Sequence, residues 1–379
     1  MKILFIVYHG FSPSSGITKK IMAQVDGLRQ NGHEVALCYY AFDDRGHRCR
    51  YVDGKVIKDY GKGAWAAMRQ RTGYRCIYDY CRSEGVEMVY ARSFHNASPW
   101  LITLFKRLRK IGVRSVTEIP TYPYDHEYRS LPLLFKLELM VDKMFRRRLA
   151  REMEAIVTFS DDKEIFGKRT IRISNGVDFG KVRMHDRSLI DTSTEVHLIG
   201  VAEVHPWHGF DRLIAGLGEY YKSGAGRRVV FHIVGGVERG EMYGSAAAPG
   251  FKPIIDRYGI CQYVVFHGQL FGEELDAVFA RCVLAVGSLA RHRSGIRNMK
   301  SLKNREYASR GLPFIYSEDD DDFDGKEYVM KVAPDETPVD IRRLLAFVDG
   351  VRMSSADIRQ SVAHLSWKRQ MQRVVEAMV

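Results

Sequence analysis

The chain has 379 residues, of which 45% are hydrophobic and 27% charged, a composition typical of a globular protein with two domains of ordinary size. No stretch approaches the ~18 consecutive apolar residues of a membrane span, and the six cysteines show neither a CxxC pair nor a zinc-like spacing, which argues against an integral membrane protein and a disulfide or zinc scaffold. The net charge of +12 is uneven, because residues 1–180 hold 31 Lys and Arg against 20 Asp and Glu while the remainder holds 27 against 26, and a positive first half suits anionic lipid or another polyanion.

The cysteines and the N-terminal residues both indicate a cytoplasmic protein. Unpaired cysteines are typical of a reducing compartment. The opening apolar run, residues 3–8, is too short for the core of a signal peptide and is followed at once by His9 and Gly10. We therefore expect the chain in the cytoplasm, with at most a peripheral contact to the inner face of the cytoplasmic membrane.

The first half of the chain alternates predicted strands and helices. Residues 2–8 and 34–40 are predicted strands on either side of a helix at about 18–31. Gly16 precedes this helix, where the lack of a side chain lets the backbone approach a phosphate, although most such glycines only serve a turn. The pattern continues with a hairpin around Asp53-Gly54, helices at 65–84 and 99–111, and strands at 88–92 and 113–119.

A polar loop and a long helix follow. The loop at residues 118–127 contains two prolines and three acids, so it is either a rigid connection or it places two carboxylates, Glu118 and Asp125, in a cleft between the two domains. The helix at about 131–154 has an apolar stripe and a cluster of three arginines near its end. This pattern fits either packing against a core or contact with an anionic membrane surface.

The second half begins after a turn at Asn175-Gly176 and a polar linker at 183–195. Residue His208 stands before a predicted helix, where it either donates a hydrogen bond to a phosphate or packs beside Trp207. Further strands are predicted at 196–201, 229–234 and 263–267.

Residues 283–316 carry the most informative pattern. Two short apolar runs, 283–286 and 312–316, are predicted parallel strands, and ligands of open α/β sheets bind at the carboxyl ends of such strands. Between the runs lie a polar loop and a helix at about 300–310, which Gly311 ends. The helix carries one carboxylate, Glu306, and the loop and first helical turn carry these basic residues: Arg291, His292, Arg293, Arg297, Lys300, Lys303 and Arg305.

This combination fits a nucleoside diphosphate. Cations beside a helix N-terminus bind phosphate, and a carboxylate further along can accept two ribose hydroxyls. The alternative is a solvated, Arg-rich helix face with an ordinary surface glutamate. The acidic run at 317–324 is predicted to be an exposed loop kept open by repulsion, rather than a metal site.

Several of these segments resemble glycosyltransferase family 4, the retaining enzymes of the GT-B fold. Residues 306–313 resemble the end of its Glu-x7-Glu signature, but the first Glu would fall on Asn298. The chain is instead similar to a branch in which SLxxHRxG, from Ser288, and LKxREY, from Leu302, surround the second Glu. The family's Arg and Lys that grip the donor diphosphate are both replaced, since Glu203 lies near the Arg position and His208 replaces Lys.

The resemblance implies a fold and a set of site residues. It implies an α/β protein with two doubly wound Rossmann-like domains facing across a cleft, with residues 1–182 on the acceptor side and residues 183–363 binding the nucleotide sugar. A C-terminal helix at 364–379 is expected to cross back to the first domain. The implied donor-binding residues are Gly16, His208, His292, Arg293, Lys303, Arg305 and Glu306, and the candidate catalytic residues are Glu118, Asp125 and His208.

We therefore expect a hexosyltransferase-type glycosyltransferase (EC 2.4) that moves a sugar from a UDP- or GDP-linked donor to an acceptor hydroxyl with retention. The resemblance suggests surface polysaccharide or glycoconjugate biosynthesis, with a lipid-linked or oligosaccharide acceptor. An anionic membrane surface is a further expected partner, whereas nucleic acid, a metal and other cofactors are not expected. Two alternatives stay open: a non-catalytic, basic, membrane-associated GT-B adaptor, and an NAD-dependent oxidoreductase, against which stands the lack of a Gly-x-Gly-x-x-Gly turn after any strand.

Overall fold

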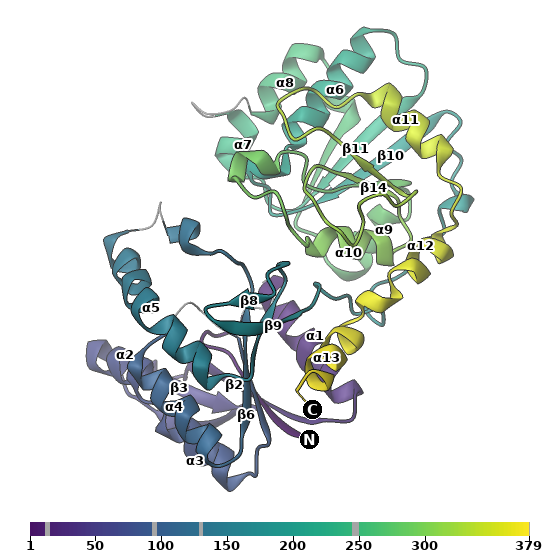
Figure 1. Ribbon diagram of the computed structural model, residues 1–379. Helices are drawn as coiled ribbons and strands as arrows, with labels where there is room; N and C mark the ends of the chain where they lie inside the picture. The colour runs from purple at the N-terminus through teal and green to yellow at the C-terminus, as the bar shows by residue number, and fades with distance from the viewer. Residues whose placement is uncertain (12–15, 93–96, 129–131, 245–249, 379) are drawn as a thin grey trace. The chain divides into compact units, whose positions relative to one another are not determined.

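A computed structural model of the protein describes residues 1–11, 16–92, 97–128, 132–244 and 250–378. The chain divides into two compact units, Met1–Gly176 with Ser366–Val379, and Val177–Leu365. Each unit contains its own β-sheet, with helices packed on both faces (Figure 1).

The first unit is built on a nine-stranded sheet of order β4-β3-β2-β1-β5-β6-β7-β9-β8. The pairs between β2 and β1, β1 and β5, β5 and β6, β6 and β7, and β7 and β9 are parallel, and the outer pairs are antiparallel. Its elements are β1 (Lys2–Ile6), α1 (Gly16–Gln30), β2 (Glu34–Phe42), β3 (Arg48–Val52), β4 (Lys55–Asp59), α2 (Gly63–Thr72), α3 (Arg75–Ser83), β5 (Met88–Arg92), α4 (Pro99–Lys110), β6 (Arg114–Ile119), η1 (Asp125–Tyr128), α5 (Leu133–Glu152), β7 (Ala155–Thr158), β8 (Glu164–Ile165), β9 (Lys168–Arg172) and α13 (Trp367–Glu376).

The central strands of this sheet are apolar throughout because both of their faces are covered. Helices α1 and α13 bury one face, where Ile21 and Met371 belong to the same core. Helices α3 and α4 bury the other face through side chains such as Ile77 and Leu104.

Helix α13 lies far from α1 in the sequence but packs directly against it. Gly27 of α1 allows this approach, since a Cβ atom there would lie 2.7 Å from the backbone oxygen of Trp367. The side chain of Gln370 anchors the same helix, because the backbone N–H of Ser174 donates to its Oε1 (2.8 Å). The first unit is therefore completed by residues from the end of the chain.

The second unit is built on a six-stranded parallel sheet of order β12-β11-β10-β13-β14-β15. Helices α6, α8 and α11 bury one face, and α9, α10 and α12 bury the other. Its elements are η2 (Arg187–Leu189), β10 (Glu195–Val201), η3 (Pro206–His208), α6 (Phe210–Lys222), β11 (Arg228–Val234), α7 (Arg239–Tyr243), α8 (Phe251–Tyr258), η4 (Cys261–Tyr263), β12 (Val264–Gly268), α9 (Gly272–Phe279), β13 (Leu284–Val286), η5 (Arg291–Ser294), α10 (Leu302–Ser309), β14 (Phe314–Tyr316), β15 (Val329–Lys331), α11 (Ile341–Gly350), α12 (Ser355–Ser361) and η6 (Ala363–Leu365).

Two sequence-based predictions of local structure are wrong. The helix predicted at 65–84 is two helices, α2 and α3, which are separated at Gly73. The acidic run at 317–324 is not an open, exposed loop: Glu318 and Asp320 are each only 1% exposed, because basic side chains of the same unit pair with the run.

Two further expectations from the sequence concern the cysteines and membrane-spanning segments. All six cysteines are free thiols. Among the helices that the structure describes, none combines the length and the apolar character needed to cross a lipid bilayer.

Candidate functional site

The candidate site lies in the second unit, at the carboxyl ends of β10, β13 and β14. Two backbone hydrogen bonds join the 3-10 helix η3 to the loop after β13. The N–H of Leu289 donates to the backbone oxygen of His208 (2.9 Å), and the N–H of Ala290 donates to the backbone oxygen of Trp207 (3.2 Å). Gly209 makes this contact possible, since its φ is +62° and a Cβ atom there would lie 2.8 Å from Ala290. The side chain of His208 is thereby fixed beside the loop.

His208 is a neutral hydrogen-bond donor. The N–H of His205 donates to His208 Nδ1 (2.9 Å), so the proton of the neutral ring is on Nε2. Burial, with added repulsion from Lys303 and Arg291, holds the pKa of His208 well below its usual range. The ring therefore offers Nε2–H to a ligand without bringing a positive charge.

Lys303 and Arg291 bring positive charge to the same place. Lys303 stands in the first turn of α10, and its Nζ is buried and has no hydrogen-bond partner in the described chain. Burial, followed by the charge of Arg291, lowers the pKa of Lys303 to about 7, and Glu318 opposes this shift. Arg291 is 7% exposed, lies over the ring of Trp207 and leaves its Nε without a partner.

Three polar groups next to these cations are also incompletely satisfied. Asn304 Nδ2 donates to Glu318 Oε1 (3.1 Å), but Glu318 Oε2, Asn304 Oδ1 and Ser288 Oγ are buried and find no partner in the described chain. Burial raises the pKa of Glu318. Carboxylate, amide and hydroxyl oxygens of this kind bind sugar hydroxyls.

Buried polar atoms without partners are rare in folded proteins, because each one costs free energy. Here several of them gather at the carboxyl end of a parallel sheet, beside the N-terminus of α10, which adds its free N–H groups and dipole. The arrangement can bind an anion that also carries hydroxyl groups.

The predicted ligands Arg293 and His292 form ion pairs within the protein. Arg293 makes two hydrogen bonds to the carboxylate of Asp211 (2.9 and 2.7 Å) and also pairs with Glu336. His292 Nε2 lies 2.6 Å from Glu336 Oε1. The hydrogen bonds from Arg293 lower the pKa of Glu336 to about 2, so these groups hold η5 against the start of α6.

Arg305, another predicted ligand, is completely buried among acids of the 317–324 run. Its guanidinium bonds to both oxygens of Asp320 (2.6 and 3.0 Å) and to Asp322. Lys300 pairs with Asp321 and Asp322. These pairs explain why the acidic run folds inward: its charge is neutralised instead of repelling itself.

Glu306 occupies the surface of α10. Its side chain is 38% exposed, and Oε1 accepts two hydrogen bonds from Arg310 (3.0 and 2.9 Å). The other oxygen, Oε2, forms no hydrogen bond within the described chain, so it can accept a hydroxyl. Arg310 in turn pairs with Asp276.

Glu118 and Asp125, both in the first unit, belong to separate networks. Glu118 is fully buried, and its Oε2 accepts from Gln24 (2.6 Å) and Tyr90 (2.5 Å). Burial opposes its ionisation, but Lys20 and Arg92 hold its pKa below the usual range. Glu118 therefore acts as an internal anchor at the ends of β5 and β6.

Asp125 lies closer to solvent than Glu118. It pairs with Arg146 (2.7 Å) and Lys143 (3.1 Å) of α5. Burial works against the charge, but these two hydrogen bonds lower the pKa of Asp125.

Gly16 begins α1 with open space around it, and the loop residues 12–15 before it lie outside the described chain.

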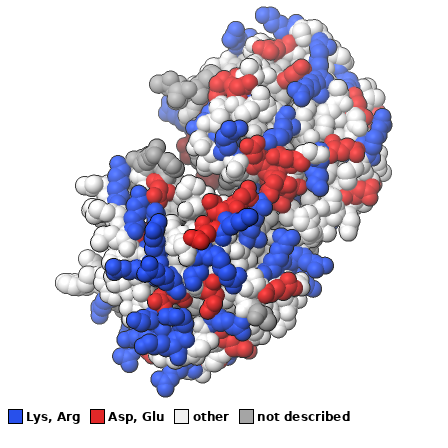
Figure 2. All heavy atoms as spheres, viewed as in Figure 1, with Lys and Arg blue, Asp and Glu red and all other residues white. Residues whose placement is uncertain are grey.

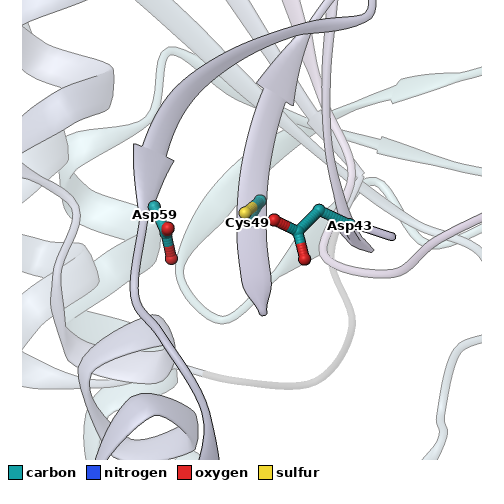
Figure 3. Close-up of side chains that lie close together, drawn as sticks. All are labelled: Asp43, Cys49 and Asp59. Carbon is teal, nitrogen blue, oxygen red and sulfur yellow. The ribbon is translucent and has the colours of Figure 1, made fainter. Parts of the chain in front are cut away.

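One further cluster of potential metal ligands, Asp43, Cys49 and Asp59, lies in the β2-β3-β4 hairpins (Figure 3). Its carboxylates serve local structure: Asp43 Oδ1 accepts from the backbone N–H of Arg45 and His47, and Asp59 pairs with His47 Nδ1 at 2.9 Å. These contacts explain the cluster without a metal.

Searches against protein-family models and curated proteins found no match, but solved structures match almost the whole chain. A trehalose-6-phosphate structure from E. coli bound with UDP-2-fluoro glucose superposes with a TM-score of 0.61 at 11% identity, over 99% of this chain and 98% of that chain. AviGT4, a glycosyltransferase involved in avilamycin A biosynthesis, has a TM-score of 0.57 at 16% identity, over 99% and 96%. The chain has a GT-B fold. A third GT-B match is the catalytic domain of starch synthase IV from Arabidopsis thaliana bound to ADP and acarbose, with a TM-score of 0.58 at 10% identity, over 99% and 98%.

Part of the candidate site is not predicted from the sequence. Asn304 and Glu318 are not among the predicted ligands, and Arg291 is only one of several loop cations in the sequence. Glu318 comes just after β14, at the carboxyl end of a strand, which is the position where a ligand-binding side chain is expected. The surrounding acids hide this signal, because a run of adjacent acids predicts an exposed loop.

Proposed function

We propose that the chain is a GT-B glycosyltransferase that moves a sugar from a nucleoside diphosphate sugar to an acceptor hydroxyl. The observation that carries this proposal is the buried, unpartnered ammonium of Lys303, which lies close to Arg291 and His208. We call this cluster of three side chains the pocket. The GT-B fold supports it, because two of the matched structures contain UDP-2-fluoro glucose and ADP.

The proposed ligand of this pocket is the donor diphosphate. Burying a cation without a partner is costly, and a bound diphosphate supplies the missing negative charge while accepting hydrogen bonds from Lys303 and His208. The N-terminus of α10 adds attraction for the same anion. Arg293, His292 and Arg305 position the loop and helix of the pocket through their ion pairs rather than by touching the donor.

The neighbouring oxygen atoms fit the rest of the donor. Glu318, Asn304 and Ser288 offer unpartnered oxygens to the transferred sugar. Glu306 offers Oε2 to the ribose, and its partner Arg310 holds the carboxylate in place through Oε1. Gly16 is the proposed backbone contact of the first domain with the donor, and Asp125 is the proposed acceptor-side carboxylate.

The proposed reaction retains the anomeric configuration. The bond between the anomeric carbon and the diphosphate oxygen breaks, the acceptor oxygen bonds to that carbon, and the acceptor proton passes to the departing diphosphate. Lys303, Arg291 and the helix dipole stabilise the charge that develops on the leaving group. Residues 183–363 would hold the donor and residues 1–182 an acceptor that is lipid-linked or an oligosaccharide, in the assembly of a surface polysaccharide or glycoconjugate.

Calorimetry with UDP, GDP, ADP and their sugars tests the donor site. Lys303→Met is expected to weaken binding of the preferred nucleotide by about 1.5–3 kcal/mol, the contribution of a hydrogen bond to a charged group. Lys326→Met is the matched control, because Lys326 is exposed and belongs to the same unit. Equal affinity of both variants and the wild type would show that the diphosphate binds elsewhere.

Release of nucleoside diphosphate in the presence of lipid-linked and oligosaccharide acceptors tests the transfer itself. A glycosyltransferase releases the nucleotide and forms a glycosidic product in equal amounts. Tight nucleotide binding without turnover of any donor and acceptor would favour the non-catalytic adaptor instead. Reduction of NAD with no requirement for a nucleotide sugar would favour the oxidoreductase.

A further inference from the structure

Helix α5 presents an apolar stripe to solvent. Amphipathic helices of globular proteins normally turn such a stripe toward the core, but here the opposite face is the buried one, with Leu139, Asp142 and Ala150 between 2% and 9% exposed. The spacing of three and four residues places the stripe on one side of the helix. Its members, which are 40–73% exposed, are Leu133, Leu137, Met140, Val141 and Met144.

Basic residues border this stripe. Helix α5 carries six Lys and Arg against three Asp and Glu, and α4 carries four Lys and Arg and no acid. Figure 2 shows Lys and Arg gathered over this part of the first unit. The exposed cations of α5 are Lys136, Lys143, Arg147, Arg148 and Arg151.

Two helices next to α5 each carry an exposed tryptophan. Trp65 of α2 is 74% exposed and Trp100 of α4 is 51% exposed. Ion pairs hold these helices to α5, because Arg71 pairs with Glu138 (3.0 Å) and Arg109 with Glu152 (3.0 Å). Helices α2, α4 and α5 are thus linked to each other, and we call the exposed apolar, tryptophan and basic side chains named above the lipid-facing surface.

We propose that the lipid-facing surface docks the protein on an anionic lipid bilayer. An apolar stripe bordered by long basic side chains matches the interface of such a bilayer, where the apolar groups enter the acyl boundary and the cations reach the anionic headgroups. Tryptophan is favoured at the same depth, because its ring is apolar and its N–H is polar. This inference goes beyond the proposed enzymatic function and does not depend on it.

Cosedimentation with lipid vesicles tests the proposal without any nucleotide or acceptor. The wild type is expected to bind vesicles with about 30% phosphatidylglycerol in phosphatidylcholine at least about tenfold more tightly than pure phosphatidylcholine vesicles, and added salt should weaken this binding. The double variant Leu137→Glu with Met144→Glu should lose most of the binding, at least about tenfold, because two carboxylates replace inserted apolar groups. Both positions are exposed, so circular dichroism and the melting temperature should stay unchanged.

Leu189→Glu provides the matched control. Leu189 is 84% exposed but belongs to the second unit, so its substitution should leave vesicle binding as it is. Absence of wild-type binding to the anionic vesicles would overturn the proposal, and so would equal binding by the double variant. A wild-type dimer in solution that the double variant converts to a monomer would also overturn it, because a second copy of the chain would then cover the stripe.

Discussion

At the scale of single residues, Lys303 lowers the stability of the fold but provides a cation for the proposed ligand. Its ammonium is buried and lacks a hydrogen-bond partner in the described chain, a situation that destabilises a folded protein. Residues kept in such positions are typical of functional sites, where stability is given up for ligand binding. The pocket is therefore expected to be a local weak point of the second unit when no ligand is bound.

Lys303→Met is accordingly expected to make the protein more stable while weakening nucleotide binding. Removing an unsatisfied buried donor should add about 1–3 kcal/mol to the free energy of unfolding. The pKa of Lys303 is about 7 in the folded state against 10.5 as its ordinary value. The charged lysine therefore lowers the free energy of unfolding of the wild type most below pH 7, and this destabilisation disappears as the pH rises toward 10.5. Thermal unfolding at pH 6, 8 and 9.5 should show the advantage of the variant shrinking with pH, and a pH-independent difference would mean that the buried ammonium charge is not its cause.

At the same scale, the sequence predicts which residues come to the pocket better than it predicts what they touch. His208 and Lys303 follow strands or begin helices at the ligand-binding end of a sheet, and position alone indicates their role. Arg293 and Arg305 stand in the same segment but meet acids from elsewhere in the chain, Asp211 and Asp320. Such long-range pairs leave no periodic signal in a single sequence, so the basic residues of one loop look alike until the fold is known.

At the scale of elements, the contact between α1 and α13 depends on a glycine. The backbone of Trp367 lies where a side chain at Gly27 would have to be, and backbone atoms cannot move aside as the end of a flexible side chain can. The close approach lets the two helices share one core with the sheet of the first unit.

Gly27→Ala is therefore expected to destabilise the first unit by about 1–3 kcal/mol, in spite of the better helix propensity of alanine. Gly16→Ala in the same helix is the matched control, since a Cβ atom there meets nothing within 4 Å. Thermal denaturation should show a lower melting temperature for the first variant, by about 2–4 °C for each kcal/mol, and a change within about 0.5 kcal/mol for the second. Equal stability of Gly27→Ala and wild type would mean that α13 can shift away from α1.

The elements differ in how readily the sequence predicts them. Continuous apolar runs such as 283–286 predict parallel strands well, because burial on both faces leaves little room for polar residues. The sequence does not predict the break between α2 and α3, because the apolar pattern continues across Gly73. For α5, periodicity identified the stripe but not its direction, since a stripe facing a core and one facing a membrane read the same in sequence.

At the scale of the whole molecule, the two units differ in charge and in the groups they offer. The basic excess lies in residues 1–180, together with the lipid-facing surface. The second unit is nearly neutral in sum but contains the concentrated positive pocket. The proposed membrane contact and the proposed donor binding thus belong to different parts of the chain, so we expect that each can be disturbed without the other.

Hydrogen exchange with and without the preferred nucleotide should show that the nucleotide protects the second unit and leaves the first unit unchanged. At about 100 times its dissociation constant, the nucleotide can add up to about 2.7 kcal/mol of protection, and this is expected at residues 206–213 and 287–305 of the second unit. The β3–β4 hairpin of the first unit should exchange at an unchanged rate and serves as the internal reference. Protection confined to the first unit would place the nucleotide outside the pocket of Lys303.

The return of α13 to the first unit sets an order of events during protein synthesis. A ribosome releases residues 1–176 first, yet the side of α1 around Gly27, against which Trp367 packs, stays uncovered until residues 367–376 have emerged. All of the second unit must be translated in between, at about 5–20 residues per second. The first unit therefore lacks its last helix for many seconds, an interval in which a chaperone can bind it, whereas the second unit is one continuous stretch of chain, residues 177–365, and can fold as soon as it leaves the exit tunnel.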